Sequence, residues 1–352
     1  MTQPEKDGLP WWASASTHRP PARGGASYDD ARTAENKPAT VKRVTSAPAG
    51  ARGVTDSRRA RRDRRAASWF IFPAAFVLTV VTLAPLAYSL FVSFTNWTLT
   101  VPGSDQQFIG LANYGRVLAS PAFWKTVQVT MTFALSATGL ELLLSVAFAL
   151  MLNQQFVGRG LIRALVLIPL VITPAVVGMF WKLLYDDQQG VFNFFLVSSG
   201  LPRIHWLDQS WALTSVVLTD VWQWTPFLVL IVLAGLHSLD VEMLEAARID
   251  GANRYQTFRY LTLPHLIPYL MVGVFFRLLD AMKDFDKIYL LTQGGPGSET
   301  STFSIYAFDT GFRIFQIGRT SAIAWLIALV SFVVSLPLLW VMSRRISREM
   351  PS

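Results

Sequence analysis

Six long apolar stretches alternate with shorter polar segments along most of the chain. Because a helix needs about 20 mostly apolar residues to cross the hydrocarbon core of a bilayer, each stretch is long enough to be a membrane span. The predicted spans are 69–94, 127–152, 161–184, 211–236, 266–291 and 321–342. Several contain proline, which a span tolerates where neighbouring helices or cavity water satisfy the freed carbonyl groups. The pattern predicts an all-α membrane protein with a bundle of six transmembrane helices.

The polar ends of the chain differ from this repeating pattern. Residues 1–67 are rich in Pro, Gly, Ala, Ser, Thr and Arg and contain few large apolar side chains. Such a segment buries too little apolar surface to offset the entropy lost on ordering, so we expect a disordered basic tail. Its closing run "RRARRDRR" (58–65) is expected to orient the first span, with anionic lipid or RNA as the alternative contacts. The transmembrane domain is then 68–345, followed by a C-terminal tail, 346–352.

Composition supports the membrane class and narrows the chemistry. The chain is 52% hydrophobic and 15% charged, whereas soluble proteins carry roughly a quarter of charged residues. Cysteine is absent, which excludes a disulfide framework, a thiolate metal site and a cysteine nucleophile. The four histidines are scattered without the spacing of metal ligands, so we expect neither a metal site nor catalytic residues.

Positive charges near the span ends indicate the orientation. Besides the basic run, they include Arg159, Arg163, Arg248, Arg254, Arg259, Arg344, Arg345 and Arg348. All of these fall on one side of a six-span bundle, which the excess of Lys and Arg identifies as the cytoplasmic side. Both termini and the segment 237–265 are therefore expected to be cytoplasmic. The loops 106–118 and 188–208 mix aromatic and turn residues and are expected to form short interfacial helices on the opposite side.

The segment 237–265 is unusually polar for a stretch between two predicted spans. Asp240 is a candidate N-cap, and Glu245 lies near the positive end of the helix that would follow. Gly251 permits a sharp turn, and a second short helix is expected to end at Leu263-Pro264 because the residue before proline avoids helical angles. A helix–turn–helix of this kind, with small side chains on one face, is suited to a groove on a partner. The alternative is an ordinary loop between spans that contains short helices.

The spacing of the residues in this segment resembles a known motif. Glu245-Ala246-Ala247 is followed after three residues by Gly251, and after nine more by Leu261-x-Leu263-Pro264. This arrangement is similar to the EAA motif of permease subunits of ATP-binding-cassette (ABC) importers, which usually have Ile at the place of Leu261. The flanking stretches "DVWQWTPFLVLIVLAGL" and "DAMKDFDKIYLLTQGGPG" resemble the maltose-type, carbohydrate-uptake branch. The resemblance covers about 68–345.

The resemblance implies a role for the segment and a set of partners. In that family the loop forms a coupling helix that docks on a cytoplasmic ATPase. The matching residues are Glu245, Ala246, Ala247, Arg248, Asp250, Gly251, Leu261, Leu263 and Pro264. It also implies a second permease subunit in a heterodimer, an ATPase dimer that binds ATP and Mg, and an extracytoplasmic solute-binding (lipo)protein at a bacterial plasma membrane. The chain has no Gly-x4-Gly-Lys-Ser/Thr phosphate loop, so we expect no ATPase of its own.

Ionisable residues inside spans are costly and are candidates for functional sites. Arg277, Asp280 and Asp284 fall on one face of a helix, and Asp220 and Gln223 share a face of another. Carboxylates, amides and guanidinium groups bind hydroxyl groups, and aromatic rings cover the apolar face of a sugar ring. By resemblance, the residues that line the translocation cavity are Asp220, Gln223, Trp224, Phe227, Arg277, Ala281 and Asp284.

A structural role is the alternative for these charges. An ion pair such as Arg277 with Asp280 would only hold helices together. Glu141, which lies in the middle of the second predicted span, is expected to pack or to bridge helices rather than to contact solute.

The predicted function is that of an importer permease for a sugar or a related polyhydroxylated solute. A self-contained, ion-coupled secondary transporter is the alternative, although such a protein would favour an internal repeat that the two halves do not show. A membrane-embedded enzyme is a third class, and no paired catalytic motif supports it. The sequence leaves the solute open among sugars, oligosaccharides, polyols and glycerophosphate derivatives.

Overall fold

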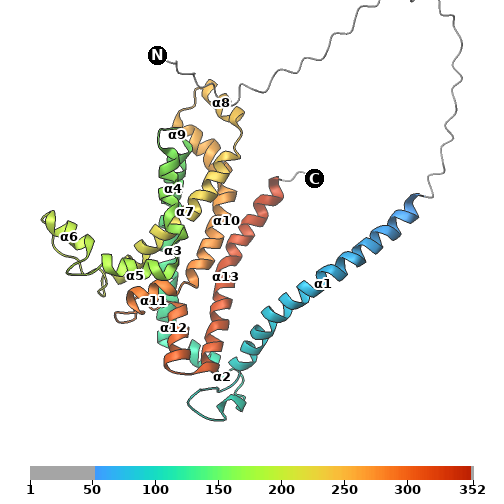
Figure 1. Ribbon diagram of the computed structural model, residues 1–352, viewed down its shortest axis with the longest axis vertical. Helices are drawn as coiled ribbons and strands as arrows, with labels where there is room; N and C mark the ends of the chain where they lie inside the picture. Colours follow the sequence, from blue (N-terminus) through green and yellow to red (C-terminus); the bar gives the residue numbers. More distant parts are fainter. Residues whose placement is uncertain (1–51, 350–352) are drawn as a thin grey trace, which may run out of the picture. The chain divides into compact units, whose positions relative to one another are not determined.

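The computed structural model describes residues 52–349, which form helices joined by loops and contain no β-strand (Figure 1). This confirms the predicted all-α fold. The α-helices are α1 (Arg52–Ser93), α2 (Ala112–Leu118), α3 (Pro121–Asn153), α4 (Arg159–Val171), α5 (Pro174–Leu184), α6 (Val191–Ser198), α7 (Ala212–His237), α8 (Val241–Ile249), α9 (Arg254–Thr257), α10 (Leu263–Met282), α11 (Asp286–Thr292), α12 (Phe303–Phe308) and α13 (Ile317–Glu349). The chain divides into two units after Pro73, and all elements from α2 onward belong to the second unit.

The helix boundaries change both predicted tails. Helix α1 begins at Arg52, so residues 52–67, which we expected in the disordered tail, are helical. Alanine and arginine, which are frequent there, are among the best helix formers, and this explains the difference. Helix α13 likewise continues to Glu349, beyond the expected boundary at 345. The remainder of the predicted tails, residues 1–51 and 350–352, lies outside the described residues.

Within residues 52–349, five helices are long and apolar enough to cross a membrane on their own. They are Phe72–Ser93, Pro121–Asn153, Ala212–His237, Arg254–Met282 and Ile317–Met342. The third predicted span, 161–184, is not one continuous helix, because α4 and α5 meet at an angle of 102°. Pro174 disfavours the helical conformation at Thr173, whose ψ is 142°. Counting this bent pair as one span gives the predicted six.

The fifth predicted span, 266–291, is also interrupted. Helix α10 ends at Met282, and Phe285 leaves the helical conformation with φ −130° before α11 begins at Asp286. Helix α11 then packs closely on α5. A Cβ atom on Gly178 of α5 would lie 3.0 Å from both Cα and O of Lys287, so only glycine allows this approach without displacement.

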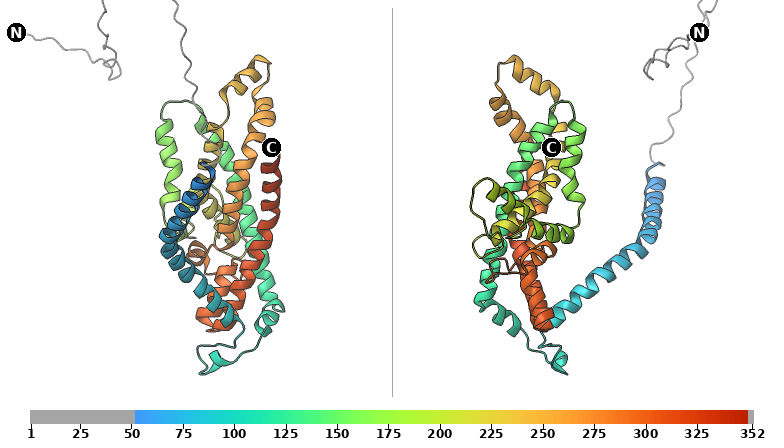
Figure 2. Two further views of the ribbon diagram at one scale, coloured as in Figure 1. Left: turned by 90° about the vertical axis from the view of Figure 1, so that its right-hand side faces the viewer. Right: turned by 60° about the vertical axis from the view of Figure 1, so that its left-hand side comes forward.

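Helix α7 is the central element of the bundle. In its most apolar stretch 67% of the residues are buried, against 33% or less in the other candidate spans. Helices α3, α7 and α10 run side by side in both sets of views (Figures 1 and 2). Glycine permits the contact of α7 with α10, since a Cβ atom on Gly235 would lie 2.8 Å from Leu266 and one on Gly273 would lie 2.8 Å from Leu228. Small residues at helix contacts let backbones approach closely in a membrane.

Candidate functional site

The segment between α7 and α10 is an exposed helix–turn–helix at one end of the second unit (Figures 1 and 2). Helix α8 begins directly after Asp240, as the sequence predicts, although the Asp240 side chain makes no capping hydrogen bond. None of the residues of α8 is buried. Its apolar side chains Val241, Met243 and Ile249 are all exposed. A helix with this much uncovered apolar surface is suited to a partner.

Gly251 makes the turn between the two helices. Its φ of +79° lies in the left-handed region that other residues disfavour. The N–H of Ala252 donates to the carbonyl of Ala247 over 2.9 Å, which closes the end of α8. Helix α9 then starts with a capping box, in which Asn253 and Gln256 each accept the other's backbone N–H.

The prediction that Leu263-Pro264 ends the second helix is wrong. Helix α9 continues through a π-helical turn, Phe258–Thr262, directly into α10. The N–H of Leu263 donates to the carbonyl of Phe258, five residues earlier. Pro264 stands in the first turn of α10, where its missing N–H and its ring are tolerated because the wide turn leaves room. The second arm of the segment is therefore continuous with a membrane-spanning helix.

A network of buried charged side chains joins α3, α7 and α10. Arg277 donates from Nε to Oε2 of Glu141 over 2.7 Å and from Nη2 to Oε1 over 3.0 Å. The same guanidinium group also pairs with Asp220. The side chains of all three residues are 1% exposed or less. Because each charge faces an opposite one at close range, the network avoids the cost of an isolated buried charge.

Lys287 extends the network to α11. Its ammonium group pairs with Asp220 and, over 2.6 Å, with Asp284, and it donates to Oε1 of Gln223 over 3.3 Å. The other end of the Gln223 amide donates to the carbonyl of Ile172 over 3.0 Å, at the bend between α4 and α5. Gln223 therefore satisfies a carbonyl group that the bend leaves free.

The ring of Trp224 lies beside both cations of the network. The ring centroid is 5.2 Å from Cζ of Arg277 and 5.8 Å from Nζ of Lys287. A cation near the face of an indole ring is attracted by the ring's quadrupole. Trp224 also helps to line a pocket of about 240 Å³, together with Pro174, Asp280, Lys283, Asp284, Phe285, Asp286 and Lys287. Below, this space is called the inner pocket.

The structure brings four of the seven predicted cavity residues, Asp220, Gln223, Arg277 and Asp284, into this network. Asp220, Gln223 and Arg277 are buried, whereas Asp284 and Trp224 border the inner pocket. The other two predicted residues are Phe227, which packs edge-on against Trp224 at 6.1 Å between centroids, and Ala281, which is fully buried.

The network differs from the sequence-based alternatives at Asp280 and agrees with them at Glu141. Asp280, the expected partner of Arg277, is 3.7 Å away and half-exposed, so it is secondary to Glu141 and Asp220. Glu141 makes the interhelix contact expected of it. Lys287 was not among the predicted cavity residues, although it is an ionisable residue of the fifth predicted span and follows Asp284 by three residues.

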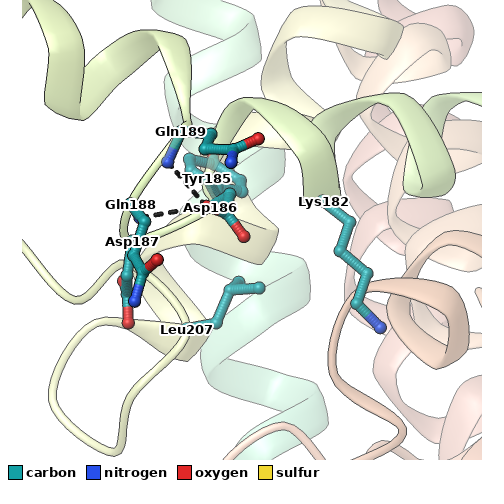
Figure 3. A pocket seen from close by; sticks show the side chains of 7 residues that line it. All are labelled: Lys182, Tyr185, Asp186, Asp187, Gln188, Gln189 and Leu207. Carbon is teal, nitrogen blue, oxygen red and sulfur yellow. Dashed lines mark hydrogen bonds between the residues drawn. The ribbon is translucent and has the colours of Figure 1, made fainter.

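A larger polar pocket lies at the other end of α5 (Figure 3). Its volume is about 520 Å³, and it is lined by Lys182, Tyr185, Asp186, Asp187, Gln188, Gln189 and Leu207. The Asp186 carboxylate accepts the backbone N–H groups of Gln189 and Gln188 over 2.8 and 2.9 Å. These two donors hold the pKa of Asp186 below its usual value. Helix α5 thus has a polar pocket at each end.

Comparisons with known proteins agree with this architecture. Residues 141–348 match the family described as "Binding-protein-dependent transport system inner membrane component". A probable ABC transporter permease protein of Sinorhizobium fredii, y4oQ, is 53% identical over 82% of this chain and 94% of its own length. The trehalose/maltose transport system permease protein MalF of Thermococcus litoralis is 36% identical, over 78% of this chain and 92% of its own.

A solved structure shares the fold. The similar structure is a chain in the crystal structure of a bacterial alginate ABC transporter in complex with alginate pentasaccharide-bound periplasmic protein. The two chains align with a TM-score of 0.68 and 24% sequence identity, and the alignment covers 81% of this chain and 96% of that chain. The family match spans more than half of the chain and includes the exposed helix–turn–helix, α10 and the whole charge network, whose first residue is Glu141. The chain is therefore a multi-pass membrane protein that belongs to the binding-protein-dependent transport system inner membrane components, the permeases of ABC importers.

Proposed function

We propose that this permease forms, with a second permease subunit, the pathway for a sugar or a related polyhydroxylated solute. The observation that carries the proposal is the inner pocket, where an indole ring lies beside carboxylates and ammonium groups. Trp224 lines this pocket, and its ring also lies beside Arg277 and Lys287 of the charge network. The relatives support the same class, since one with 36% identity is named as a trehalose/maltose permease.

The cavity residues take two roles in this proposal. Trp224 and Asp284 border the inner pocket and are the candidates for direct contact with solute. Asp220, Gln223 and Arg277 are covered by protein and act by holding α7, α10 and α11 in register around the pocket. Sugar recognition by a ring stacked on an indole, with carboxylates on the hydroxyl groups, needs such fixed geometry.

The exposed helix α8 is proposed to dock on a separate cytoplasmic ATPase subunit, which would bind ATP and Mg. The exposed members of the motif are Glu245, Ala246, Arg248, Asp250, Gly251 and Pro264, while Ala247, Leu261 and Leu263 are half-buried. Small Ala246 leaves room for close approach, and the neighbouring apolar side chains supply a surface to bury. With α8 on the cytoplasmic side, both termini are expected in the cytoplasm, which is also the expectation from the positively charged residues near the span ends.

The connections of α8 suggest how ATP hydrolysis would reach the solute. Helix α7 leads into α8, and α9 continues without a break into α10. Asp220 on α7 and Arg277 on α10 are joined by an ion pair beside the inner pocket. A tilt of the docked segment would therefore move both helices together. An extracytoplasmic binding protein would deliver solute from the opposite side, as the alginate transporter's complex with its periplasmic protein suggests by analogy.

The docking is tested by cross-linking with single cysteines, because the chain has none of its own. Ala246→Cys on α8 is expected to cross-link to the ATPase of the purified transporter through a short thiol–amine reagent. Ser210→Cys, which is exposed just before α7 at the other end of that helix, is the matched control and should not cross-link. Equal yields from both positions, or none from Ala246→Cys in an active transporter, would remove the assignment.

A further inference from the structure

A small polar cavity is lined by residues of the segment after α1, of α2 and around the start of α13. These elements lie at the end of the second unit opposite α8 (Figures 1 and 2). The volume of the cavity is about 110 Å³. The lining residues are Asn96, Trp97, Thr98, Asn113, Arg116, Gln316 and Arg319. Below, this space is called the arginine cavity. It is separate from the inner pocket and from the pocket of Figure 3, and the proposed function does not use it.

Hydrogen bonds to backbone carbonyl groups hold the walls of the arginine cavity in place. The buried Asn113 amide donates to the carbonyls of Ser93 and Thr95 over 2.9 and 2.8 Å. The N–H of Gly318 donates to the carbonyl of Trp97 over 3.0 Å. A side chain at Gly318 would overlap the carbonyl oxygen of Thr95, so the close approach of α13 requires glycine. A binding site on such a frame is preformed and loses little entropy when it is occupied.

The arginine cavity contains positive charge without a counter-ion. Neither Arg116 nor Arg319 forms an ion pair with any acidic residue of the described chain. Arg319 donates to Oε1 of Gln316 and to the hydroxyl of Tyr306, over 3.4 and 3.2 Å, but its Nε is buried and has no acceptor among the residues that the structure describes. A buried donor without an acceptor calls for a partner.

We propose that the arginine cavity receives the carboxylate of an acidic side chain on the extracytoplasmic solute-binding protein. A carboxylate accepts about four hydrogen bonds and pairs with guanidinium groups in a planar, bidentate geometry. The side-chain amides of Asn96 and Gln316 offer further donors at the same place. This inference rests on the proposed function, which supplies the partner and the orientation of the chain.

The surroundings of the arginine cavity favour a protein over a lipid headgroup. The loop 99–111 extends beyond the ends of α12 and α13 in the views of Figures 1 and 2, at the end of the second unit opposite α8. Its side chains Leu99, Val101, Phe108 and Leu111 are exposed. The loop connects Thr98 and Asn113, which both line the arginine cavity, and protein–protein interfaces are enriched in arginine and aromatic side chains.

The test uses the complete transporter in nanodiscs of neutral lipid, titrated with the solute-loaded binding protein that stimulates its ATPase. Arg319→Gln should raise the half-maximal concentration of binding protein roughly tenfold, and Arg116→Gln, which is more exposed, by less. The ATPase rate at saturation should not change, because the cavity is remote from α8. Arg313→Gln is the matched control, since Arg313 lies on the same side but is already paired with Asp309 over 3.2 Å.

A second variant controls for misfolding and identifies the residue of the binding protein that makes the contact. Arg319→Lys keeps the positive charge and supplies an amine, so it should largely restore the affinity. A carbodiimide should then join that amine to the docked carboxylate as an amide, with the water taken up by the reagent, and mass spectrometry should identify one acidic residue of the binding protein.

The possible outcomes are distinct. Wild-type titration curves for both glutamine variants, with no amide formed by Arg319→Lys, would overturn the inference while leaving the proposed function intact. An effect that appears only with anionic lipid would assign the arginine cavity to a headgroup and would also overturn it. If no binding protein stimulates the wild-type transporter, the proposed function fails and this inference fails with it.

Discussion

Replacing Arg277 by glutamine tests the charge network at its most connected member. In the Arg277→Gln variant, Glu141 stays buried without the cation that it contacts through both oxygens, while Asp220 keeps Lys287. Removing one partner of a buried ion pair costs about 3–5 kcal/mol. Since 1 kcal/mol shifts the Tm of a chain of 150–250 residues by about 2–4 °C, we expect a decrease on the order of 10 °C.

The assay is thermal denaturation of the purified protein in one detergent, followed by loss of the monodisperse peak in size-exclusion chromatography. The double variant Glu141→Gln with Arg277→Gln should recover most of the loss, because it leaves no unpaired charge in the network. Asp280→Asn is the matched control. It should melt close to the wild type, since Asp280 is half-exposed and 3.7 Å from the guanidinium group.

Two results would refute this reasoning. The first is an Arg277→Gln protein that melts within about 2 °C of the wild type, because a buried Glu141 without its cation cannot be that well tolerated. The second is rescue of Arg277→Gln by Asp284→Asn instead of by Glu141→Gln. Asp284 pairs with Lys287, so its removal should leave the unpaired Glu141 unchanged.

Three further predictions concern the backbone and the tail. A transporter with Gly251→Val should assemble but lose much of its solute-stimulated ATP hydrolysis. A β-branched residue at φ +79° costs about 1–2 kcal/mol and shifts the turn, so stimulation at the wild-type level would contradict this prediction. Gly178→Ala should lower the yield of folded protein, because overpacking α5 on α11 costs about 1–3 kcal/mol. Gly160→Ala is the control, since Gly160 has open space around it and its replacement should leave the yield unchanged; equal yields of the two variants would contradict the packing. Deleting residues 2–51 and keeping the basic run 58–65 should leave uptake unchanged; an assembled but inactive truncated transporter would give the tail a regulatory role.

The transmembrane spans were predictable because length and apolar content alone decide whether a helix can cross a bilayer. The start of α8 and the turn at Gly251 were also predictable, since each depends on residues within a few positions of one another. The helix at residues 52–67 differs from the predicted tail because a low content of large apolar residues does not exclude a helix where alanine and arginine give a high helix propensity.

The breaks in the helices were not predictable from local sequence. Proline in a predicted span did not indicate the 102° bend between α4 and α5, where the carbonyl of Ile172 accepts from Gln223, 51 residues further along the chain. The continuation through Leu263-Pro264 depends on a π-helical turn, whose wider spacing removes the clash that a proline ring normally causes.

The candidate site was predictable in its members more than in its contacts. Intramembrane polarity identified Asp220, Gln223, Arg277 and Asp284, and the structure brings them together. Their pairing could not be read from the spacing on one helix, because Glu141 is 136 residues before Arg277 in the chain. Long-range partners of this kind follow from the packing of α3 on α7 and α10, which no local pattern specifies.

Reconstitution into proteoliposomes tests the central claim most directly. The chain alone is compared with the complete transporter, which contains the second permease and the ATPase, in the presence of the solute-loaded binding protein. We predict uptake of labelled solute only by the complete transporter and only with ATP on the α8 side of the membrane, and no uptake by the chain alone under a proton or sodium gradient. Gradient-driven uptake by the chain alone would contradict its assignment as a permease subunit that depends on a separate ATPase.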